Sequence, residues 1–308
     1  MPPSNSDPPP PTTGSATGNT QYNTIVSAYS KLYPPSGETS KTFPLSILEA
    51  HQLHTTLVQD PSISIPGKHI LDFACGGGYY SAKFLSWGAA SITGVDISRE
   101  MLDAARQEAA SRGVEGQMKF VEGDATDVSL AIDAPDGAGA KFDVVTGCWL
   151  LNYAGDTASM TRMWTVIGSH LKPGGVFVGL VNPPLLTGKP FEGELLDAAM
   201  EETGAWGKYG QRGRCLESMP GNDGFKVRVE LGFPERGDDV AAFDCYYLCN
   251  RVYEDGIKGS GLFESLEWRD FLVPKGERGG GERPVGFWND LVLYPNARVC
   301  VARRLGGE

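Results

Sequence analysis

A glycine-rich turn between an apolar strand and a helix is the feature that most restricts the fold of this chain. Residues 71–80 read LDFACGGGYY, so three consecutive glycines join a short buried-type strand to a segment with helical patterning. Such a turn brings backbone N–H groups close to a ligand at a helix N-terminus. The motif therefore predicts the opening strand, turn and helix of an α/β sheet that binds a ligand at this edge.

The segments after this turn repeat the strand and helix pattern as far as residue 182. Strands that alternate with helices predict a doubly wound parallel sheet, with its ligand crevice at the carboxyl ends of the strands. The predicted strands cover residues 68–74, 91–96, 118–124, 141–151 and 176–182, and the predicted helices between them include 98–113 and 157–171.

Composition divides the chain into five regions. Residues 1–20 consist almost entirely of Pro, Ser, Thr, Gly and Asn, which predicts a disordered tail. We expect a helical lid at 21–66, the doubly wound core at 67–184, an inserted α+β cap at 185–260, and C-terminal strands at 261–308 that complete the core sheet.

The cap and the C-terminal region show strand patterning of a different kind. FKVRVELGF and AAFDCYYLC, at 225–233 and 241–249, predict a hairpin or small sheet in the cap, and 192–203 predicts a helix. FESLEWRDFLVP at 263–274 and ARVCVARRL at 297–305 predict a final strand pair of the main sheet.

Three acidic residues lie in or at the ends of the first three predicted strands. Asp96 at the second strand end is placed to accept hydrogen bonds from both ribose hydroxyls, and Asp124 at the third is placed near an adenine edge. Asp72 beside the turn would repel a pyrophosphate but suits a cofactor that carries ammonium and sulfonium groups. Ser81 also stands where a dinucleotide fingerprint has its third glycine. The pattern favours S-adenosylmethionine over a nicotinamide dinucleotide.

LDFACGGGYY, GVDIS, EGDA, FDVVTGCWLLNYA and LKPGG, in this order, resemble the successive motifs of class I S-adenosylmethionine-dependent methyltransferases, over residues 68–182. QYNTI near the start, FACG, GAASITGVDIS, WLLNYA and PVGFWND near the end further resemble small-molecule N-methyltransferases of the toxoflavin-pathway type. The resemblance implies a Rossmann-like sheet, S-adenosylmethionine as cofactor and S-adenosylhomocysteine as product. Ala74 stands where the class usually has the first loop glycine.

The resemblance also implies a set of cofactor-binding residues. The methionine portion would lie among the residues of the glycine loop, the ribose at Asp96, and the adenine at the ends of the next two strands. The backbone carbonyl of Cys148 would face the cofactor's amino group, and Tyr22 would cover the cofactor, although helix-face packing also explains that tyrosine. The implied set is Tyr22, Asp72, Ala74, Gly76, Gly78, Asp96, Ile97, Met101, Asp124, Ala125 and Cys148.

Methyl transfer from a sulfonium requires alignment of the nucleophile, and a protein base only if the acceptor must lose a proton. Residues after the fourth strand lie beside the crevice, which favours Trp149, Asn152 and Tyr153. Further candidates are one of Tyr246 and Tyr247, because neighbours on a strand face opposite ways, and His51 or His54. The two histidines are also explained as an ordinary packed or solvated pair. Trp149, Asn152, Tyr247 and His54 form the selected catalytic set.

Charge and composition restrict the partners. The formal net charge of −11 disfavours a nucleic-acid substrate, and no apolar run approaches the ~20 residues of a membrane helix. The six cysteines lack zinc-type spacing, and the segment after the fourth strand offers too few oxygen ligands for a metal, so we expect reduced thiols, a cytoplasmic location and no metal. The expected partner is a small-molecule methyl acceptor, bound by a monomer or homodimer.

The resemblance to toxoflavin-pathway-type enzymes implies S-adenosylmethionine-dependent methyl transfer to a small, heteroaromatic acceptor in secondary metabolism, with nitrogen favoured as the methylated atom. A ring nitrogen with a free lone pair needs no protein base, and no strong base is visible in the sequence. The alternatives are O- or S-methylation of a small phenol or thiol, and a non-catalytic cofactor-binding regulatory protein.

Overall fold

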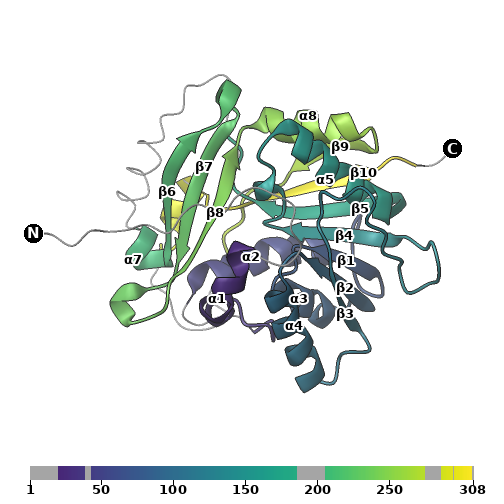
Figure 1. Cartoon of the computed structure of the whole chain (residues 1–308), viewed down its shortest axis with the longest axis horizontal. Coiled ribbons are helices and arrows are strands. Elements are labelled where there is room, and N and C mark those ends of the chain that lie inside the picture. Colours follow the sequence, from purple (N-terminus) through teal and green to yellow (C-terminus); the bar gives the residue numbers. More distant parts are fainter. Residues whose placement is uncertain (1–19, 39–42, 186–204, 275–285, 294, 307–308) are drawn as a thin grey trace, which may run out of the picture.

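The computed structural model describes residues 20–38, 43–185, 205–274, 286–293 and 295–306, which contain a large and a small sheet (Figure 1). The large sheet has the strand order β3-β2-β1-β4-β5-β10-β9. Its first five strands in that order are parallel, whereas β10 runs antiparallel to both β5 and β9. The strands are β1 (His69–Phe73), β2 (Ser91–Asp96), β3 (Met118–Glu122), β4 (Phe142–Cys148), β5 (Leu171–Val181), β9 (Phe263–Trp268) and β10 (Arg298–Arg304).

This order confirms the predicted α/β fold, including the final strand pair. The chain order reverses between β1 and β4, and ligands of doubly wound sheets bind at the carboxyl ends of the strands on either side of that point. The glycine-rich turn follows β1 and Trp149 follows β4, so the topology brings these two segments to one crevice.

Helices cover both faces of the large sheet because strand side chains alternate between them. Ile70 and Val144 join the hydrophobic cluster that includes α3, while Leu71 and Val145 join the cluster that includes α5 and α8. No helix in the described ranges combines the length and apolarity needed to cross a membrane. The helices are α3 (Tyr79–Ser86), α4 (Arg99–Ser111), α5 (Thr157–His170) and α8 (Asn250–Ser260), with a short 3-10 helix η3 (Leu151–Tyr153) after β4.

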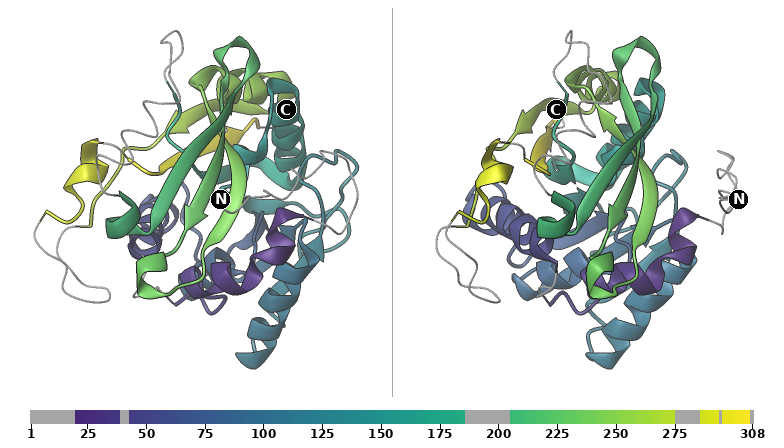
Figure 2. Two further views of the ribbon diagram at one scale, coloured as in Figure 1. Left: turned by 60° about the vertical axis from the view of Figure 1, so that its left-hand side comes forward. Right: turned by 90° about the vertical axis from the view of Figure 1, so that its left-hand side faces the viewer.

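The small sheet contains β6 (Gln211–Ser218), β7 (Gly224–Leu231) and β8 (Ala241–Leu248), paired antiparallel in that order. It stands beside the large sheet, with the N-terminal helices lying next to both (Figures 1 and 2). The hairpin expected in the cap is confirmed as β7 and β8, whereas β6 was not predicted. The expected tail, except residue 20, and the expected helix at 192–203 lie outside the described residues. Short elements are α7 (Ala205–Tyr209), η4 (Pro220–Asn222), η5 (Pro234–Arg236) and α9 (Asn289–Leu293).

The boundary predicted for the end of the cap is wrong. Helix α8 lies within the predicted cap at 185–260, yet it packs on α5 of the main sheet. The close approach depends on small residues: a Cβ atom at Gly256 would collide with Met160, and one at Gly259 would lie 2.8 Å from the Thr161 hydroxyl. The helix therefore belongs to the core.

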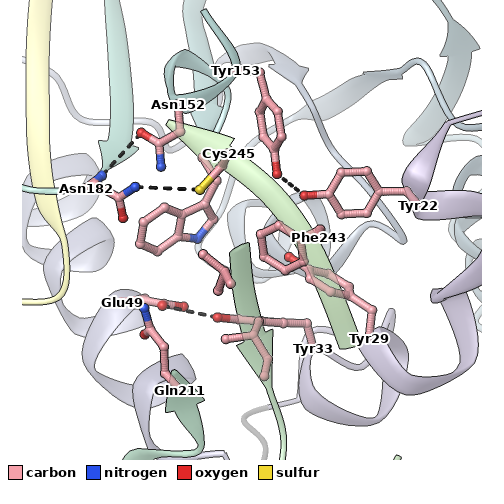
Figure 3. Close-up of a pocket in the computed structure, with 13 residues that line it drawn as sticks. Tyr22, Tyr29, Tyr33, Glu49, Asn152, Tyr153, Asn182, Gln211, Phe243 and Cys245 are labelled. Carbon is pink, nitrogen blue, oxygen red and sulfur yellow. Dashed lines mark hydrogen bonds between the residues drawn. The ribbon is translucent and has the colours of Figure 1, made fainter. Parts of the chain in front are cut away.

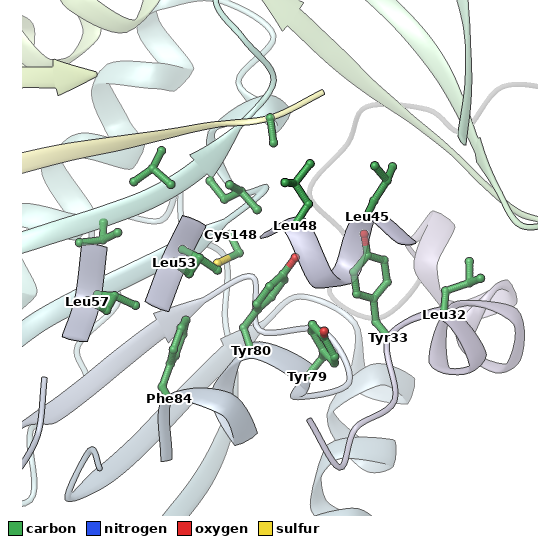
Figure 4. Close-up of a cluster of buried hydrophobic side chains, with 14 of the residues drawn as sticks. Leu32, Tyr33, Leu45, Leu48, Leu53, Leu57, Tyr79, Tyr80, Phe84 and Cys148 are labelled. Carbon is green, nitrogen blue, oxygen red and sulfur yellow. The ribbon is translucent and has the colours of Figure 1, made fainter. Parts of the chain in front are cut away.

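The N-terminal region also divides differently from the prediction. Residues Gln21–Thr24 form the 3-10 helix η1, followed by α1 (Val26–Leu32), α2 (Pro44–His54) and a π-helical turn η2 (Thr55–Gln59). Leu45, Leu48 and Leu53 of α2 are at most 1% exposed and pack in a cluster that includes residues of α3 (Figure 4). Helix α2 is thus part of the core, and the name lid segment is used below for Gln21–Leu32 alone.

Candidate functional site

The turn after β1 forms an open cradle at the sheet edge. Ala74, Gly76 and Gly78 have φ of +54°, +52° and +86°, which folds the chain back before α3 begins. Nothing lies within 4 Å of the point where a Cβ atom on Gly76 would be, so the backbone there faces open space. The left-handed conformation of Ala74 costs about 1 kcal/mol of strain, because its Cβ crowds the following carbonyl.

Asp96 holds this turn against the end of β2. Its Oδ2 atom accepts a hydrogen bond from the Gly76 N–H at 2.8 Å, and its Oδ1 atom accepts one from the Ser98 N–H at 2.8 Å. Burial raises the pKa of Asp96, while these two N–H donors lower it. Each oxygen keeps a lone pair for a ligand, since a carboxylate oxygen has two. Ile97 beside it is 40% exposed and offers an apolar face.

Asp72 has an internal role in the structure. Its Oδ2 atom accepts the Ser81 hydroxyl at 2.5 Å and its Oδ1 atom accepts the Thr146 hydroxyl at 2.7 Å, which links β1 to α3 and β4. The residue is 1% exposed, and burial raises its pKa to about 6. The Asp72 carboxyl thus holds together the elements on which the glycine-rich turn is mounted, through hydrogen bonds to α3 and β4.

The other residues expected at the cofactor lie along the same edge of the sheet. Asp124 accepts both the N–H and the hydroxyl of Thr126, at 2.7 and 2.8 Å, in a turn after β3. Cys148 ends β4, and the side chains of Met101, Ala125 and Cys148 are buried. An open turn, a carboxylate with spare lone pairs and an exposed isoleucine fit S-adenosylmethionine, whose methionine, ribose and adenine need these three surfaces.

A cavity opens beside this edge, and the empty space at this site, open solvent included, is about 450 Å³. Its walls come from the lid segment, α2, the turn after β4, the end of β5 and the inner face of the small sheet (Figure 3). Aromatic side chains predominate, which suits a small organic ligand. The lining residues are Tyr22, Tyr29, Tyr33, Glu49, Trp149, Asn152, Tyr153, Asn182, Gln211, Val229, Leu231, Phe243 and Cys245.

Trp149 and Asn152 line the cavity, as does Tyr153. Trp149 has φ of +65°, a conformation that a bulky side chain rarely adopts, and its backbone N–H donates to the Leu180 carbonyl at 2.6 Å. Strained backbone of this kind concentrates at functional sites. Asn152 is fixed through its Oδ1 atom, which accepts the Asn182 N–H at 3.3 Å (Figure 3).

The structure does not place Tyr247 or His54 among the residues that line the cavity, so it does not bring these two predicted catalytic residues together with Trp149 and Asn152. Tyr247 shares a face of β8 with Phe243 and Cys245, but it lies beyond them and is buried opposite Phe225. The ring of His54 packs edge-on against Trp87, with centroids 5.1 Å apart. Tyr246 and His51 are likewise absent from the cavity wall.

Glu49 is the acidic residue of this site among those that the sequence reasoning missed, which also include Asn182, Gln211 and Cys245. Its side chain is 1% exposed and accepts hydrogen bonds from the hydroxyls of Tyr33 at 3.1 Å and Tyr80 at 2.7 Å. Burial raises its pKa to about 8, against the lowering effect of the two tyrosines. A signal was present, because Glu49 lies four residues from both Leu45 and Leu53, on the apolar face of its helix.

The lid segment closes one side of the cavity and bonds to the small sheet. The Tyr22 hydroxyl forms a hydrogen bond with that of Tyr153, and its ring lies 5.5 Å from that of Phe243. The side-chain amide of Gln21 donates to the Asp244 carbonyl at 2.9 Å and accepts the Asp244 N–H at 2.7 Å. Tyr22 therefore packs against aromatic neighbours and also lines the cavity.

Comparison with known proteins identifies the core. A family model described as a methyltransferase domain matches residues 70–175. Two ubiquinone biosynthesis O-methyltransferases, from Aeromonas salmonicida and Stutzerimonas stutzeri, are 36% and 34% identical over 126 and 124 residues. These matches cover 41% and 40% of this chain and 48% of each relative, so the chain spans about half the length of the curated relatives it matches.

Solved structures agree on the fold. The CcbJ methyltransferase from Streptomyces caelestis superposes with a TM-score of 0.53 at 16% identity, covering 93% of this chain and 99% of that one. The PH0226 protein from Pyrococcus horikoshii gives a TM-score of 0.52 at 17% identity, covering 90% and 98%. The predicted fold is confirmed, and residues 70–175 match a methyltransferase domain.

Proposed function

We propose that the chain transfers a methyl group from S-adenosylmethionine to a nitrogen atom of a small acceptor that contains a flat ring. The observation that carries this proposal is the aromatic cavity beside the glycine-rich turn, because Trp149 borders the cavity directly after the strand that ends in Cys148. Flat aromatic walls favour a ring stacked or packed edge-on between them.

We assign the residues to two neighbouring sites, one for the cofactor and one for the acceptor. The turn at 74–78, Asp96 and Asp124 would hold the cofactor, whose sulfonium supplies an already activated methyl group. Trp149 and Asn152 would orient the acceptor, and the lid segment would exclude water. Alignment at van der Waals distance is the main catalytic contribution that such a transfer needs.

The choice of atom has two lines of support that differ. The resemblance to toxoflavin-pathway-type enzymes favours nitrogen and a heteroaromatic acceptor in secondary metabolism, whereas the names of the curated relatives favour oxygen. The relatives match only about two fifths of this chain, and most residues of the acceptor cavity lie outside residues 70–175, which match the methyltransferase domain. We therefore propose nitrogen first, and O-methylation of a phenol as the second candidate. S-methylation and a purely regulatory cofactor-binding role are weaker alternatives.

The test is a screen for S-adenosylhomocysteine formation. Purified protein is incubated with labelled S-adenosylmethionine and nitrogen heteroaromatics, amines, phenols and thiols, with Asp96→Ala as the control that lacks the ribose carboxylate. Turnover restricted to nitrogen acceptors supports the proposal, and turnover restricted to phenols or thiols refutes it. Binding of cofactor without turnover of any acceptor would favour the regulatory role. We also propose that the protein acts on a small molecule, as a monomer or homodimer, without nucleic acid or membrane.

A further inference from the structure

Glu49 supplies the only charged side chain among the described residues that line the acceptor cavity. No Lys, Arg or His in the described part of the chain forms an ion pair with it. Its two hydrogen-bond donors are the neutral hydroxyls of Tyr33 and Tyr80. A buried carboxylate without a cation is costly, so a ligand that brings a positive charge gains from binding there.

The surroundings of Glu49 also suit a cation. Tyr29, Tyr33 and Trp149 line the same cavity, and aromatic faces attract ammonium groups through their quadrupoles. Figure 3 shows the Glu49 carboxyl meeting the Tyr33 hydroxyl within this aromatic wall. A neutral phenol or a neutral heteroaromatic ring brings no positive charge, so the Glu49 carboxyl keeps its proton beside such a ligand, whereas an ammonium group favours the ionised carboxylate.

Glu49 is connected by hydrogen bonds to Trp149, the first residue after β4. The Tyr80 hydroxyl, which donates to Glu49, accepts a hydrogen bond from the Trp149 indole N–H at 3.4 Å. Trp149 in turn follows Cys148 at the end of β4. One hydrogen-bonded chain therefore joins the carboxyl to the residue that borders the cofactor edge.

From this geometry we propose that the acceptor nitrogen enters the cavity as a protonated primary or secondary amine, and that Glu49 binds this ammonium and takes its proton. The inference rests on the proposed methyl transfer and names its acceptor class. As the ammonium binds, the Glu49 carboxyl loses its own proton to solvent. The ammonium then gives one proton to the resulting carboxylate, which leaves a neutral amine and a carboxylic acid. The nitrogen lone pair then forms the bond to the methyl carbon, while the carbon–sulfur bond breaks and its electron pair stays on sulfur. The products are a methylated ammonium and S-adenosylhomocysteine.

The neighbouring titratable groups do not compete for this role near neutral pH. Burial raises the pKa of Tyr29 and Tyr33, of Tyr80 from α3, and of Cys148 from β4, so all four stay protonated. Lys83 of α3 has its pKa lowered to about 8 by burial, but its ammonium lies over the Tyr79 ring, 4.9 Å from the centroid. Glu49 has its own pKa raised to about 8 and holds a proton at pH 7 before an ammonium arrives.

Binding of an amine therefore has a signature that a structural role would not give. Calorimetry at pH 7 in buffers of different ionisation enthalpy, with the S-adenosylhomocysteine complex, is expected to show release of close to one proton when an arylalkylamine such as 2-phenylethylamine binds. The neutral isostere 2-phenylethanol should release none. Glu49→Gln should abolish the proton release and weaken amine binding about 10- to 100-fold, the range for a lost charged hydrogen bond.

Turnover supplies the second readout. Glu49→Gln is expected to lower kcat/KM for amines about 100-fold or more, as for loss of a general base, whereas the exposed Glu254→Gln should leave it unchanged. Glu49→Asp, which keeps the carboxyl, should retain part of the activity. Undiminished turnover of an amine by Glu49→Gln, amine binding without proton release, or turnover of phenols only would overturn the inference. Absence of turnover with every acceptor class would instead refute the methyl transfer itself.

Discussion

Replacement of Glu49 by glutamine is expected to change how the stability of the protein depends on pH. Glu49 is a buried carboxyl with a pKa raised from 4.5 to about 8, while in the unfolded chain it returns to its ordinary value. Between these two values the folded protein holds a proton that the unfolded chain releases. The contribution of Glu49 to the stability of the folded protein is therefore greatest below about pH 4.5, and it falls as the pH rises towards 8.

The size of this effect depends on the pKa shift. One pKa unit corresponds to about 1.4 kcal/mol, so the raised pKa of Glu49 lowers the unfolding free energy by on the order of 3 kcal/mol at pH 7 and by about 5 kcal/mol above pH 8, relative to a residue with an unshifted pKa. That is a large part of the roughly 5–15 kcal/mol that typically stabilises a domain. Glutamine keeps the shape and an acceptor for the tyrosine hydroxyls, but it does not ionise.

Urea unfolding monitored by circular dichroism at several pH values between about 5 and 8 measures this difference. The wild type should lose several kcal/mol relative to Glu49→Gln over that range, while the exposed Glu254→Gln should run parallel to the wild type. Lys83 has its pKa lowered to about 8, so its contribution to the stability of the protein rises only above pH 8. It therefore does not affect the comparison between about pH 5 and 8. Parallel curves for wild type and Glu49→Gln would refute the claim that this carboxyl is held neutral by burial.

Three further results are expected. Asp96→Ala should weaken S-adenosylmethionine binding about 10- to 100-fold in calorimetry, because it removes the carboxylate proposed to accept two ribose hydrogen bonds, and unchanged affinity would exclude that site. Trp149→Ala should lower kcat/KM more than His54→Ala in steady-state kinetics, since only Trp149 lines the cavity; the opposite order would return the histidine to the site. Deletion of residues 1–20 should leave turnover intact, whereas deletion to residue 32 should abolish it because the cavity loses Tyr22 and Tyr29; equal activities would contradict closure by the lid segment.

The sequence predicted the parts of the fold that depend on local patterns. Apolar runs such as HILDF and FDVVTGC are strands because both faces of the sheet are covered, and the glycine turn sets the direction of the chain after β1. Strand β6 was not predicted, because its sequence QRGRCLES carries charged residues at positions where a strand pattern has apolar residues. It is held by antiparallel pairing with β7, the next strand along the chain.

The sequence predicted only those parts of the candidate site that follow from the topology of the sheet. Trp149 and Asn152 are expected from the rule that ligands bind after the strands, which depends only on topology. Tyr247 was misplaced because alternation along β8 gives the face but not the position along it. Glu49 was missed because a glutamate on a helix is usually solvated, and its burial depends on the packing of α2 against α3.

The contact between Gln21 and Asp244 has a consequence for association between molecules. Strand β8 is an outer strand of the small sheet, and the Gln21 amide satisfies both backbone groups of Asp244 on its unpaired side. Free strand edges are templates for pairing with another chain. The Gln21 side chain occupies the place that a strand of another molecule would take. Loss of this glutamine would leave the backbone N–H and C=O of Asp244 unpaired at the sheet edge, which favours aggregation.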